Sequence, residues 1–555
     1  PTYFNTCFKE RYGFTPGEAK IREHLEQERP KFKKTGKEKT MFKVVLGILF
    51  LIILFSYINH RSILSKLQKD TPSISPLLSN DSTKSIAVLP FKNWSGDPEL
   101  EYISDGMTDA VISRISEIKE MDRVVPFTSS VQFKNSEKSM PELAKTLNVF
   151  YILEGNFQKQ GSQFKINLRL NDGPLNKQIW SGSYSGEWKT NEIFEIQSKV
   201  AENVANIMNV KLTERDYDAF TGIPTKSEEA YNYYLLAEYQ NNKFNQTSFK
   251  NAIPLYEKAF AMDSTFVEPL LGLADIYVTG GAVWGLYGEQ EAWRNAKFYL
   301  QKASAIDGEN VRLSDQLFVG KFYFEWDFEA VEQYISDNYA HKGADNWNEY
   351  LFVDYYIKTG KCAYALSELN KLILEDPSFG WLFAIRASVI FFLYSAAEAK
   401  KELKHIDPLF LDDMFYLREA AKWYYYFGAY EESRLMLEKL MNSFPDRPPI
   451  VAWLNAVHFE MANNREGVQE SLSTLQKHYV KGSSGSPAWF MALYYCHIQE
   501  DREVFKWLQK SYDNHEVEMT WLRAEPLLEP YRQDPRYLDL YKKMKFPVPP
   551  LSSLD

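Results

Sequence analysis

The stretch Ser85-Ile-Ala-Val-Leu-Pro-Phe91 marks the point at which the first folded domain begins. Before it, residues 61–84 are rich in Ser, Thr, Pro, Asn and Asp without hydrophobic periodicity, which is typical of a linker. The stretch itself is a short apolar run, and such a run predicts a buried strand. A polar loop, Asn93-Trp-Ser-Gly-Asp-Pro-Glu99, follows, and helical periodicity begins at Ser104. The domain is therefore predicted to open with a strand, a loop and a helix.

The residues that follow continue this alternation of strands and helices. The predicted elements are, in order, a strand at Val124, a helix over Met140–Leu147 capped by Ser139, a hairpin turning at residues 160–162, a strand from Ile179 and a helix over Asn191–Lys211. This βαβαβββα order predicts a mixed sheet with helices packed on it. We assign this α/β domain to residues 85–213.

Five short motifs make the region similar to the TolB-like N-terminal domain of bacterial membrane-bound regulators. They are Ile86-Ala-Val-Leu-Pro-Phe91, Ser95-Gly-Asp-Pro-Glu99, Asp105-Gly106, Tyr151-Ile-Leu-Glu-Gly155 and Ile179-Trp-Ser181. The resemblance covers roughly residues 84–213. It implies a non-catalytic module rather than an enzyme.

Three carboxylates on the first predicted helix allow a catalytic alternative. Glu101, Asp105 and Asp109 recur at helical spacing, so they lie near one face, where paired carboxylates can act as acid and base. We interpret Asp105 as the cap of the helix and the other two as solvated. The glycine-rich segment 482–485 lacks the Gly-Lys-Ser/Thr of a phosphate loop. No catalytic residue is therefore assigned, and the protein is not expected to be an enzyme.

From Ser227 the sequence changes to long amphipathic helices rich in aromatic residues, Ala and Leu. Pairs of helices end at recurring segments, which are Ala261-Met-Asp263, Ala305-Ile-Asp307, Glu375-Asp-Pro377 and His405-Ile-Asp407. The gap of 31 residues from Asp376 to Asp407 is near the tetratricopeptide period of about 34, whereas the gap of 44 from Asp263 to Asp307 implies an insertion around residues 283–288. Residues 227–545 thus resemble a degenerate tetratricopeptide array of about six or seven helix pairs. The resemblance implies an all-α solenoid whose surface binds an extended protein or peptide partner.

An apolar run over residues 44–60 predicts a single transmembrane helix, because Val44 to Ile58 contains no charged residue. Lysines crowd the preceding segment, residues 29–43, and are sparser in the linker that follows. The positive-inside rule then places the N-terminus in the cytoplasm. We expect a bacterial inner (cell) membrane protein whose C-terminal region is periplasmic or extracellular.

The N-terminal residues 1–28 show the pattern of two short helices. Phe4 and Phe8 share one helix face, Gly13 suits a helix end, and Thr15-Pro16 opens a second helix. Tyr3-Phe4, Phe8-Lys9, Tyr12-Gly13 and Thr15-Pro16 resemble the C-terminal end of the AraC-type helix-turn-helix domain. The chain begins with Pro1, and we expect it to be an N-terminally truncated remnant of that all-α domain.

The resemblance to AraC-type domains implies DNA contacts in the first helix. Thr2, Asn5 and Thr6 are the candidate readers of base edges, and Lys9 is a candidate phosphate contact. A family member often carries Arg where this chain has Thr6, which puts the identity of the bases read in doubt.

The composition limits the remaining functions. The formal net charge is −10, so nucleic-acid binding must be local rather than spread over the chain. The three cysteines are too few and too scattered for a disulfide framework or a zinc site. The eight histidines contain no pair at metal-binding spacing, so no metal or cofactor is expected.

Together these features predict a multidomain, membrane-tethered bacterial transcriptional regulator. DNA binding in the cytoplasm would be controlled by signal or partner binding outside the membrane, with a homodimer allowed. This mechanism depends on domain order alone. Two alternatives stay open. One is a membrane-anchored tetratricopeptide scaffold without a DNA role, and the other is the tail of a membrane nucleotide cyclase.

Overall fold

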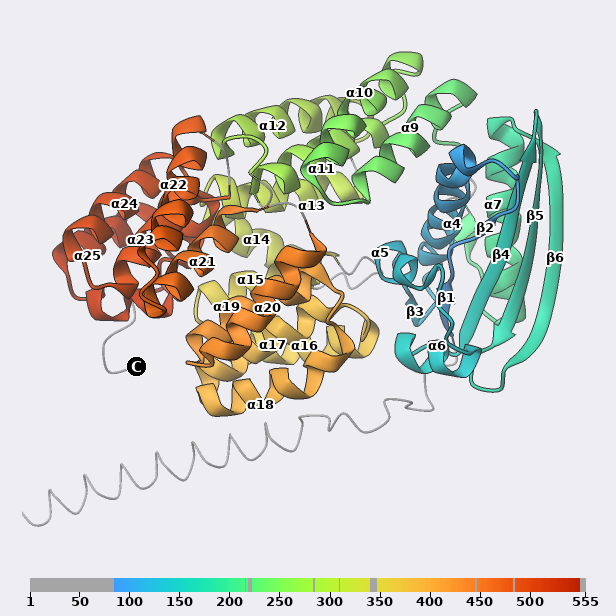
Figure 1. Ribbon diagram of the computed structural model, residues 1–555. Coiled ribbons are helices and arrows are strands. Elements are labelled where there is room, and N and C mark those ends of the chain that lie inside the picture. Colours follow the sequence, from blue (N-terminus) through green and yellow to red (C-terminus); the bar gives the residue numbers. More distant parts are fainter. Residues whose placement is uncertain are drawn as a thin grey trace, which may run out of the picture. The chain divides into compact units, whose positions relative to one another are not determined.

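The computed structural model describes residues 84–549, apart from 215, 218–221, 283–284, 309, 340–346, 445–446 and 483–484. The described part contains a six-stranded sheet with its helices, followed by a long array of helices (Figure 1). The described part is therefore mostly helical, with one small sheet. The predicted helix-turn-helix remnant lies outside the described residues.

The expectation of a transmembrane helix and a single-pass membrane location is corrected here. In the part of the chain that the structure describes, no helix is both long enough and apolar enough to cross a bilayer. The segment on which the expectation depended, residues 44–60, lies outside the described residues. The long helices of the array are instead apolar on the side that packs against neighbouring helices.

The sheet runs in the order β3-β1-β4-β5-β6, with β2 also paired to β4. Its strands are β1 (Ser85–Val88), β2 (Lys92–Asn93), β3 (Arg123–Val124), β4 (Tyr151–Gln160), β5 (Gln163–Asp172) and β6 (Lys177–Glu187). β1 pairs in parallel with β3 and β4, whereas β4, β5 and β6 form an antiparallel meander. The β4–β5 turn lies at Gly161, whose φ of +60° suits glycine.

The helices of this domain are α4 (Glu101–Ser116), α5 (Phe127–Ser130), α6 (Met140–Leu147) and α7 (Thr190–Ile207), with 3₁₀ turns η1 (Pro98–Leu100) and η2 (Val131–Phe133). Alternate β5 residues, Phe164, Ile166, Leu168 and Leu170, are buried with α4 and α7 in one core. The other face of β1 and β4 packs on α6. The sheet is thus covered on both faces near β1 and on one face at β5.

The helical array begins directly after this domain. Its helices are α9 (Glu228–Asn241), α10 (Gln246–Met262), α11 (Glu268–Ala282), α12 (Glu289–Ile306), α13 (Val311–Val319), α14 (Phe328–Tyr339), α15 (Trp347–Lys358), α16 (Cys362–Glu375), α17 (Gly380–Leu393), α18 (Ala396–Ile406), α19 (Met414–Tyr426), α20 (Tyr430–Ser443), α21 (Pro449–Met461), α22 (Arg465–Lys481), α23 (Pro487–His497), α24 (Asp501–Asp513) and α25 (Pro535–Met544). Consecutive helices of the array pack against each other in pairs, such as α9 with α10 and α23 with α24, whereas α13 and α14 meet through the segment between them.

Short turns complete the array. They are the π-helical turn η3 (Gly320–Phe324), η4 (Asp407–Leu409), η5 (Val517–Trp521) and η6 (Pro526–Tyr531). Trp521 of η5 is buried. Its ring centroid lies 5.1 Å from Nζ of Lys358, on α15, and 4.4 Å from Nζ of Lys422, on α19. The C-terminal turn η5 therefore fills space between α15 and α19.

The array and the α/β domain share one hydrophobic core. Ala230, Tyr231 and Leu235 of α9, and Phe266 before α11, belong to the cluster formed by the sheet, α4 and α7. The two regions pack tightly at Gly106, where a Cβ atom would lie 2.5 Å from Leu235 Cδ2. Because the core continues across the two regions, they are expected to unfold together.

We expect Leu235→Ala to lower the free energy of unfolding by about 2–5 kcal/mol, because it leaves a cavity in this shared core. Leu435→Ala is the matched control, since the Leu435 side chain is 49% exposed on α20. Its cost should stay within about 0.5 kcal/mol. Urea unfolding followed by circular dichroism measures both values. Equal costs for the two variants would show that the shared core contributes nothing.

Candidate functional site

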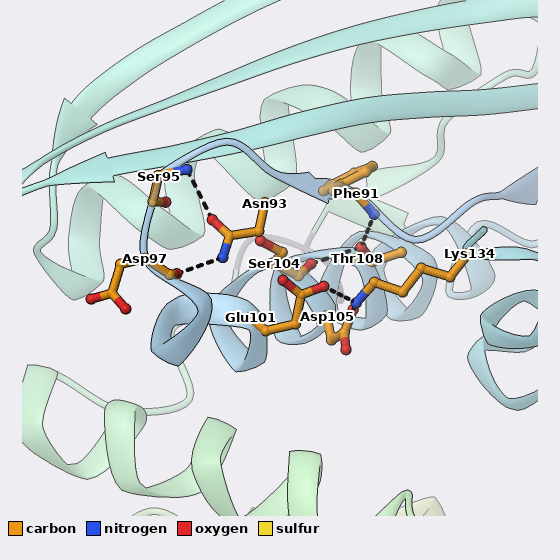
Figure 2. Close-up of polar contacts among 9 residues, drawn as sticks. All are labelled: Phe91, Asn93, Ser95, Asp97, Glu101, Ser104, Asp105, Thr108 and Lys134. Atoms are coloured by element: carbon orange, nitrogen blue, oxygen red, sulfur yellow. Dashed lines mark hydrogen bonds and ion pairs between the residues drawn. The ribbon is translucent and has the colours of Figure 1, made fainter.

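The four predicted DNA-binding residues, Thr2, Asn5, Thr6 and Lys9, lie outside the described residues, so the structure does not place them. Within the described part, the polar residues singled out from the sequence gather around the start of α4. Figure 2 shows this region, which consists of the loop from β2 to α4, the first turns of α4 and Lys134. We call it the α4 site.

The loop that enters α4 is held by its own side chains. Asn93 accepts a hydrogen bond from the Ser95 N–H at 2.9 Å and donates one to the Asp97 carbonyl at 2.8 Å (Figure 2). Asp97 caps the η1 turn by accepting the Glu99 N–H, and Gly96 has a φ of +76°. The motif around Ser95 and Glu99 therefore builds a rigid turn and has no visible catalytic geometry.

The loop is also tied to the sheet and to the helix. The Lys159 N–H donates to Ser95 Oγ at 3.0 Å, and the Phe91 N–H donates to Thr108 Oγ1 at 2.9 Å. Thr108 in turn donates to the Ser104 carbonyl one turn earlier (Figure 2). The only large hydrophobic side chain that the loop leaves exposed is Trp94, at 59%. Thr108 had no recognisable signal in the sequence, because a threonine in a helix is usually unremarkable.

Lys134 forms ion pairs with two of the three carboxylates. Its Nζ lies 2.5 Å from Asp105 Oδ1 and also forms an ion pair with Glu101 (Figure 2). Burial raises the pKa of Asp105, and the hydrogen bond from Lys134 opposes that rise. Burial lowers the pKa of Lys134, but its two carboxylate partners outweigh this effect and raise it above the ordinary value. The group is a closed ion-pair triad, which holds α4 against the segment after η2.

The interpretation of Asp105 as a helix cap is wrong. The helix begins at Glu101, with Leu100 at the cap position, so Asp105 lies inside it. Glu101 and Asp105 both pair with Lys134, whereas Asp109 forms no ion pair with Lys134 in the described structure. The three residues therefore do not form one site.

Asp109 lies in a different environment, on the side of α4 that faces the array. Burial, helped by nearby Glu238 and Asp105 and opposed by Arg312, raises the pKa of Asp109 to about 7. Glu238 accepts a hydrogen bond from the Tyr256 hydroxyl at 2.7 Å. The carboxyl of Asp109 is thus poised to change its charge near neutral pH, at the junction between α4, α9 and α13.

A second set of contacts joins the α/β domain to the fourth helix pair. Ser129 donates to Asp376 at 2.5 Å, and Asn148 donates to the Leu374 carbonyl at 2.8 Å. Arg123 is buried, and burial lowers its pKa to about 10 while Asp376 and Glu375 oppose the change. The sequence carried no sign of these contacts, because the paired residues are 226 to 247 positions apart.

The described residues include no cluster of three or more His, Cys, Asp or Glu side chains that could hold a metal ion. Cys496 is buried, and His497 instead shares a 2.9 Å hydrogen bond with the Tyr425 hydroxyl. Burial raises the pKa of the Cys362 thiol to about 11, which disfavours a reactive thiolate. These side chains therefore serve packing and hydrogen bonding in the array.

Comparison with known proteins finds a family model that matches most of the α/β domain. Residues 82–203 match the family model described as the second domain of HilA/YgeH-like transcriptional regulators. A protein of Rhizobium meliloti (strain 1021), described as "Putative adenylate cyclase 3", is 28% identical over 195 residues, which are 35% of this chain and 33% of that protein. The match thus spans about a third of that curated relative's length. The chain contains a domain similar to that of a transcriptional regulator.

Three solved structures are similar over parts of the chain. Lipoprotein GNA1162 from Neisseria meningitidis is 23% identical, covers 22% of this chain and 98% of its own, and has a TM-score of 0.18. The pilF protein of Pseudomonas aeruginosa is 15% identical, covers 49% of this chain and 98% of its own, and has a TM-score of 0.23. A monomeric mutant of IFIT1 with Gppp-AAAA is 14% identical, covers 63% of this chain and 74% of its own, and has a TM-score of 0.29.

We expect the stability of the protein to depend on the charge of Asp109. Its pKa of about 7 exceeds the ordinary value of 3.8, so the folded state holds this proton more tightly than the unfolded state. The stability that Asp109 contributes is therefore full below about pH 3.8 and is lost as the pH rises through 7.

The variant Asp109→Asn should accordingly be more stable than the unchanged protein at pH 8, by about 1–3 kcal/mol. The difference should shrink towards pH 5. Glu99→Gln makes the same charge change on an exposed residue and serves as the control. Thermal unfolding across this pH range measures the effect, and a gap that is constant with pH would contradict the assignment.

Proposed function

We propose that the protein is a transcriptional regulator that acts by binding rather than by catalysis. The match of residues 82–203 to a HilA/YgeH-like regulator domain carries this proposal. DNA would be bound by an AraC-type helix-turn-helix element to which residues 1–28 belong. The TolB-like α/β domain and the helical array would together bind the protein or peptide that controls it.

The shared core supports a controlling role for the array. Leu235 of α9 packs on Gly106 of α4, and Trp188 Nε1, just before α7, donates to Asn232 of α9 at 2.9 Å. A partner that shifts α9 would therefore change the packing of both helices that cover the sheet. Interior packing transmits such shifts because it resists compression. This is a mechanical route between the array and the α/β domain.

A surface of the array offers the chemistry for a partner. A hollow of about 440 Å³ lies along α12 and reaches Phe324 and His515. Its rim includes Arg294 and the half-exposed ring of Phe298, and its wall includes Trp293. Aromatic residues and arginine are the side chains that contribute most to protein interfaces. We propose this hollow as one place where a partner side chain docks.

The same hollow also supports the alternative of a scaffold with no DNA role, because such a scaffold requires only the array. A second alternative is the tail of a nucleotide cyclase, which the similarity to the putative adenylate cyclase favours. Both alternatives predict that this chain contributes nothing to the recognition of a DNA sequence. Binding to selected DNA therefore separates them from the proposed function.

The test is selection of random-sequence duplex DNA by the full-length protein, followed by titration of the selected site. Asn5→Ala should lower affinity for that site by about 1–3 kcal/mol and relax the preference at one base pair. Lys9→Ala should weaken binding to all sequences and reduce the salt dependence by about one charge.

Lys66→Ala, in the linker, removes the same charge outside the helix-turn-helix element and should leave binding unchanged. If no sequence is enriched, or if both N-terminal variants bind the selected site like the unchanged protein, the regulator proposal fails and a scaffold or cyclase tail is favoured.

A further inference from the structure

The sheet ends in a long strand whose outer side has no partner in the described residues. β6 pairs only with β5, and Figure 1 shows it as the outermost strand of the sheet. The opposite edge is β3, which has only two residues. An exposed edge of this length presents unpaired backbone N–H and carbonyl groups, which can pair with another strand.

At alternate residues of β6, the backbone N–H and carbonyl groups point away from β5. The Glu187 N–H donates to the Glu192 carboxylate at 2.6 Å, so it faces away from β5. In an antiparallel ladder the residues two, four and six positions earlier face the same way. The outward groups of Ser185, Ser183 and Ser181 have no hydrogen bond to any other segment that the structure describes.

The usual protections of an edge strand are missing from the straight part of β6. Residues 178–186 contain no charged residue and no proline. One irregularity is present, because Leu170 pairs with Trp180 and Asn171 with Gln178, which leaves Ile179 as a bulge. The regular edge therefore runs from Trp180 to Glu187. Natural edge strands are normally blocked by lysine, proline or an inward charge.

The charges at the two ends of β6 select its partner. Lys177 begins the strand, and Glu187, whose exposed carboxylate also forms an ion pair with Lys189 of its own copy, ends it. If β6 pairs antiparallel with β6 of a second copy, centred on Gly182, each Lys177 comes near the other copy's Glu187. Parallel pairing would instead bring like charges together at both ends, which is destabilising. The pairing centred on Gly182 also sets Ser181 opposite Ser183, and both direct their backbone groups outward.

The side chains on the α7 side suit the same pairing. Trp180 lies over Gly182, because a Cβ atom on Gly182 would be 2.5 Å from the indole ring. Tyr184 is fixed by a 3.1 Å hydrogen bond from Asn203 of α7. In the antiparallel register Trp180 of one copy lies opposite Tyr184 of the other. Cross-strand aromatic pairs stabilise a sheet.

We propose that two copies of this chain associate through β6, which joins their sheets into one continuous antiparallel sheet about a two-fold axis. The occupant of the edge is a second copy, since the strand complements its own charge pattern. A single strand from each copy gives a small interface, so the dimer is expected to form in the micromolar range. This inference does not depend on the proposed DNA binding, and the association can be tested on the protein without DNA.

The test is sedimentation velocity of the full chain from about 1 to 100 µM. The unchanged protein should convert from monomer to dimer in this range. Lys177→Glu sets two carboxylates together at each end and should weaken the dimer about tenfold. Glu187→Lys should do the same by setting two lysines together. The double variant, which exchanges the two charges, should restore the dimer to within about threefold.

Two further variants complete the design. Lys165→Glu makes the same charge change on the exposed face of β5, away from the edge, and should leave association unchanged. Ser183→Pro removes one outward N–H while the β5 ladder keeps its own bonds, and should abolish the dimer. A protein that stays monomeric throughout, or a Lys177→Glu variant that the charge exchange does not rescue, would overturn the proposal.

Discussion

The close contact between α4 and α9 at Gly106 is the constraint on which the described structure depends. With no side chain at Gly106, the Leu235 side chain can occupy the space that a Cβ atom would need. Leu235 then enters the core beneath the sheet, together with Tyr231 and Phe266. Because these residues belong to the array, the α/β domain completes its core only when the first helix pair is in place. This contact makes one folded unit out of two regions that differ in sequence character.

The same helix shows how environment decides the role of a carboxylate. Asp105 is held by Lys134 in an ion-pair triad, whereas Asp109, one turn later, meets Glu238 and has its pKa raised to about 7. Neither arrangement resembles a catalytic acid and base pair, in which two carboxyl groups share one reacting group. The first arrangement anchors α4, and the second places a group that changes charge at neutral pH on the surface that faces the array.

Local features of the sequence predicted the elements that local interactions determine. The hairpin turn at Gly161 and the Ser139 cap of α6, where Glu142 completes a capping box, both follow from residues within a few positions of each other. The predicted start of α4 and the role of Asp105 were wrong, because the decisive partner, Lys134, lies 29 residues further along the chain.

By itself, the sequence determined the α/β order of the first domain, the helical repeats after Ser227 and the motifs around Ser95, Asp105 and Gly155, since periodicity and turn chemistry act over short distances. Tertiary structure alone decided that Gly106 serves packing against Leu235, that Lys134 joins two carboxylates, and that η5 fills the space between α15 and α19. It also decided which strand is left at the edge of the sheet. These outcomes depend on contacts between residues far apart in the chain, which no local pattern records.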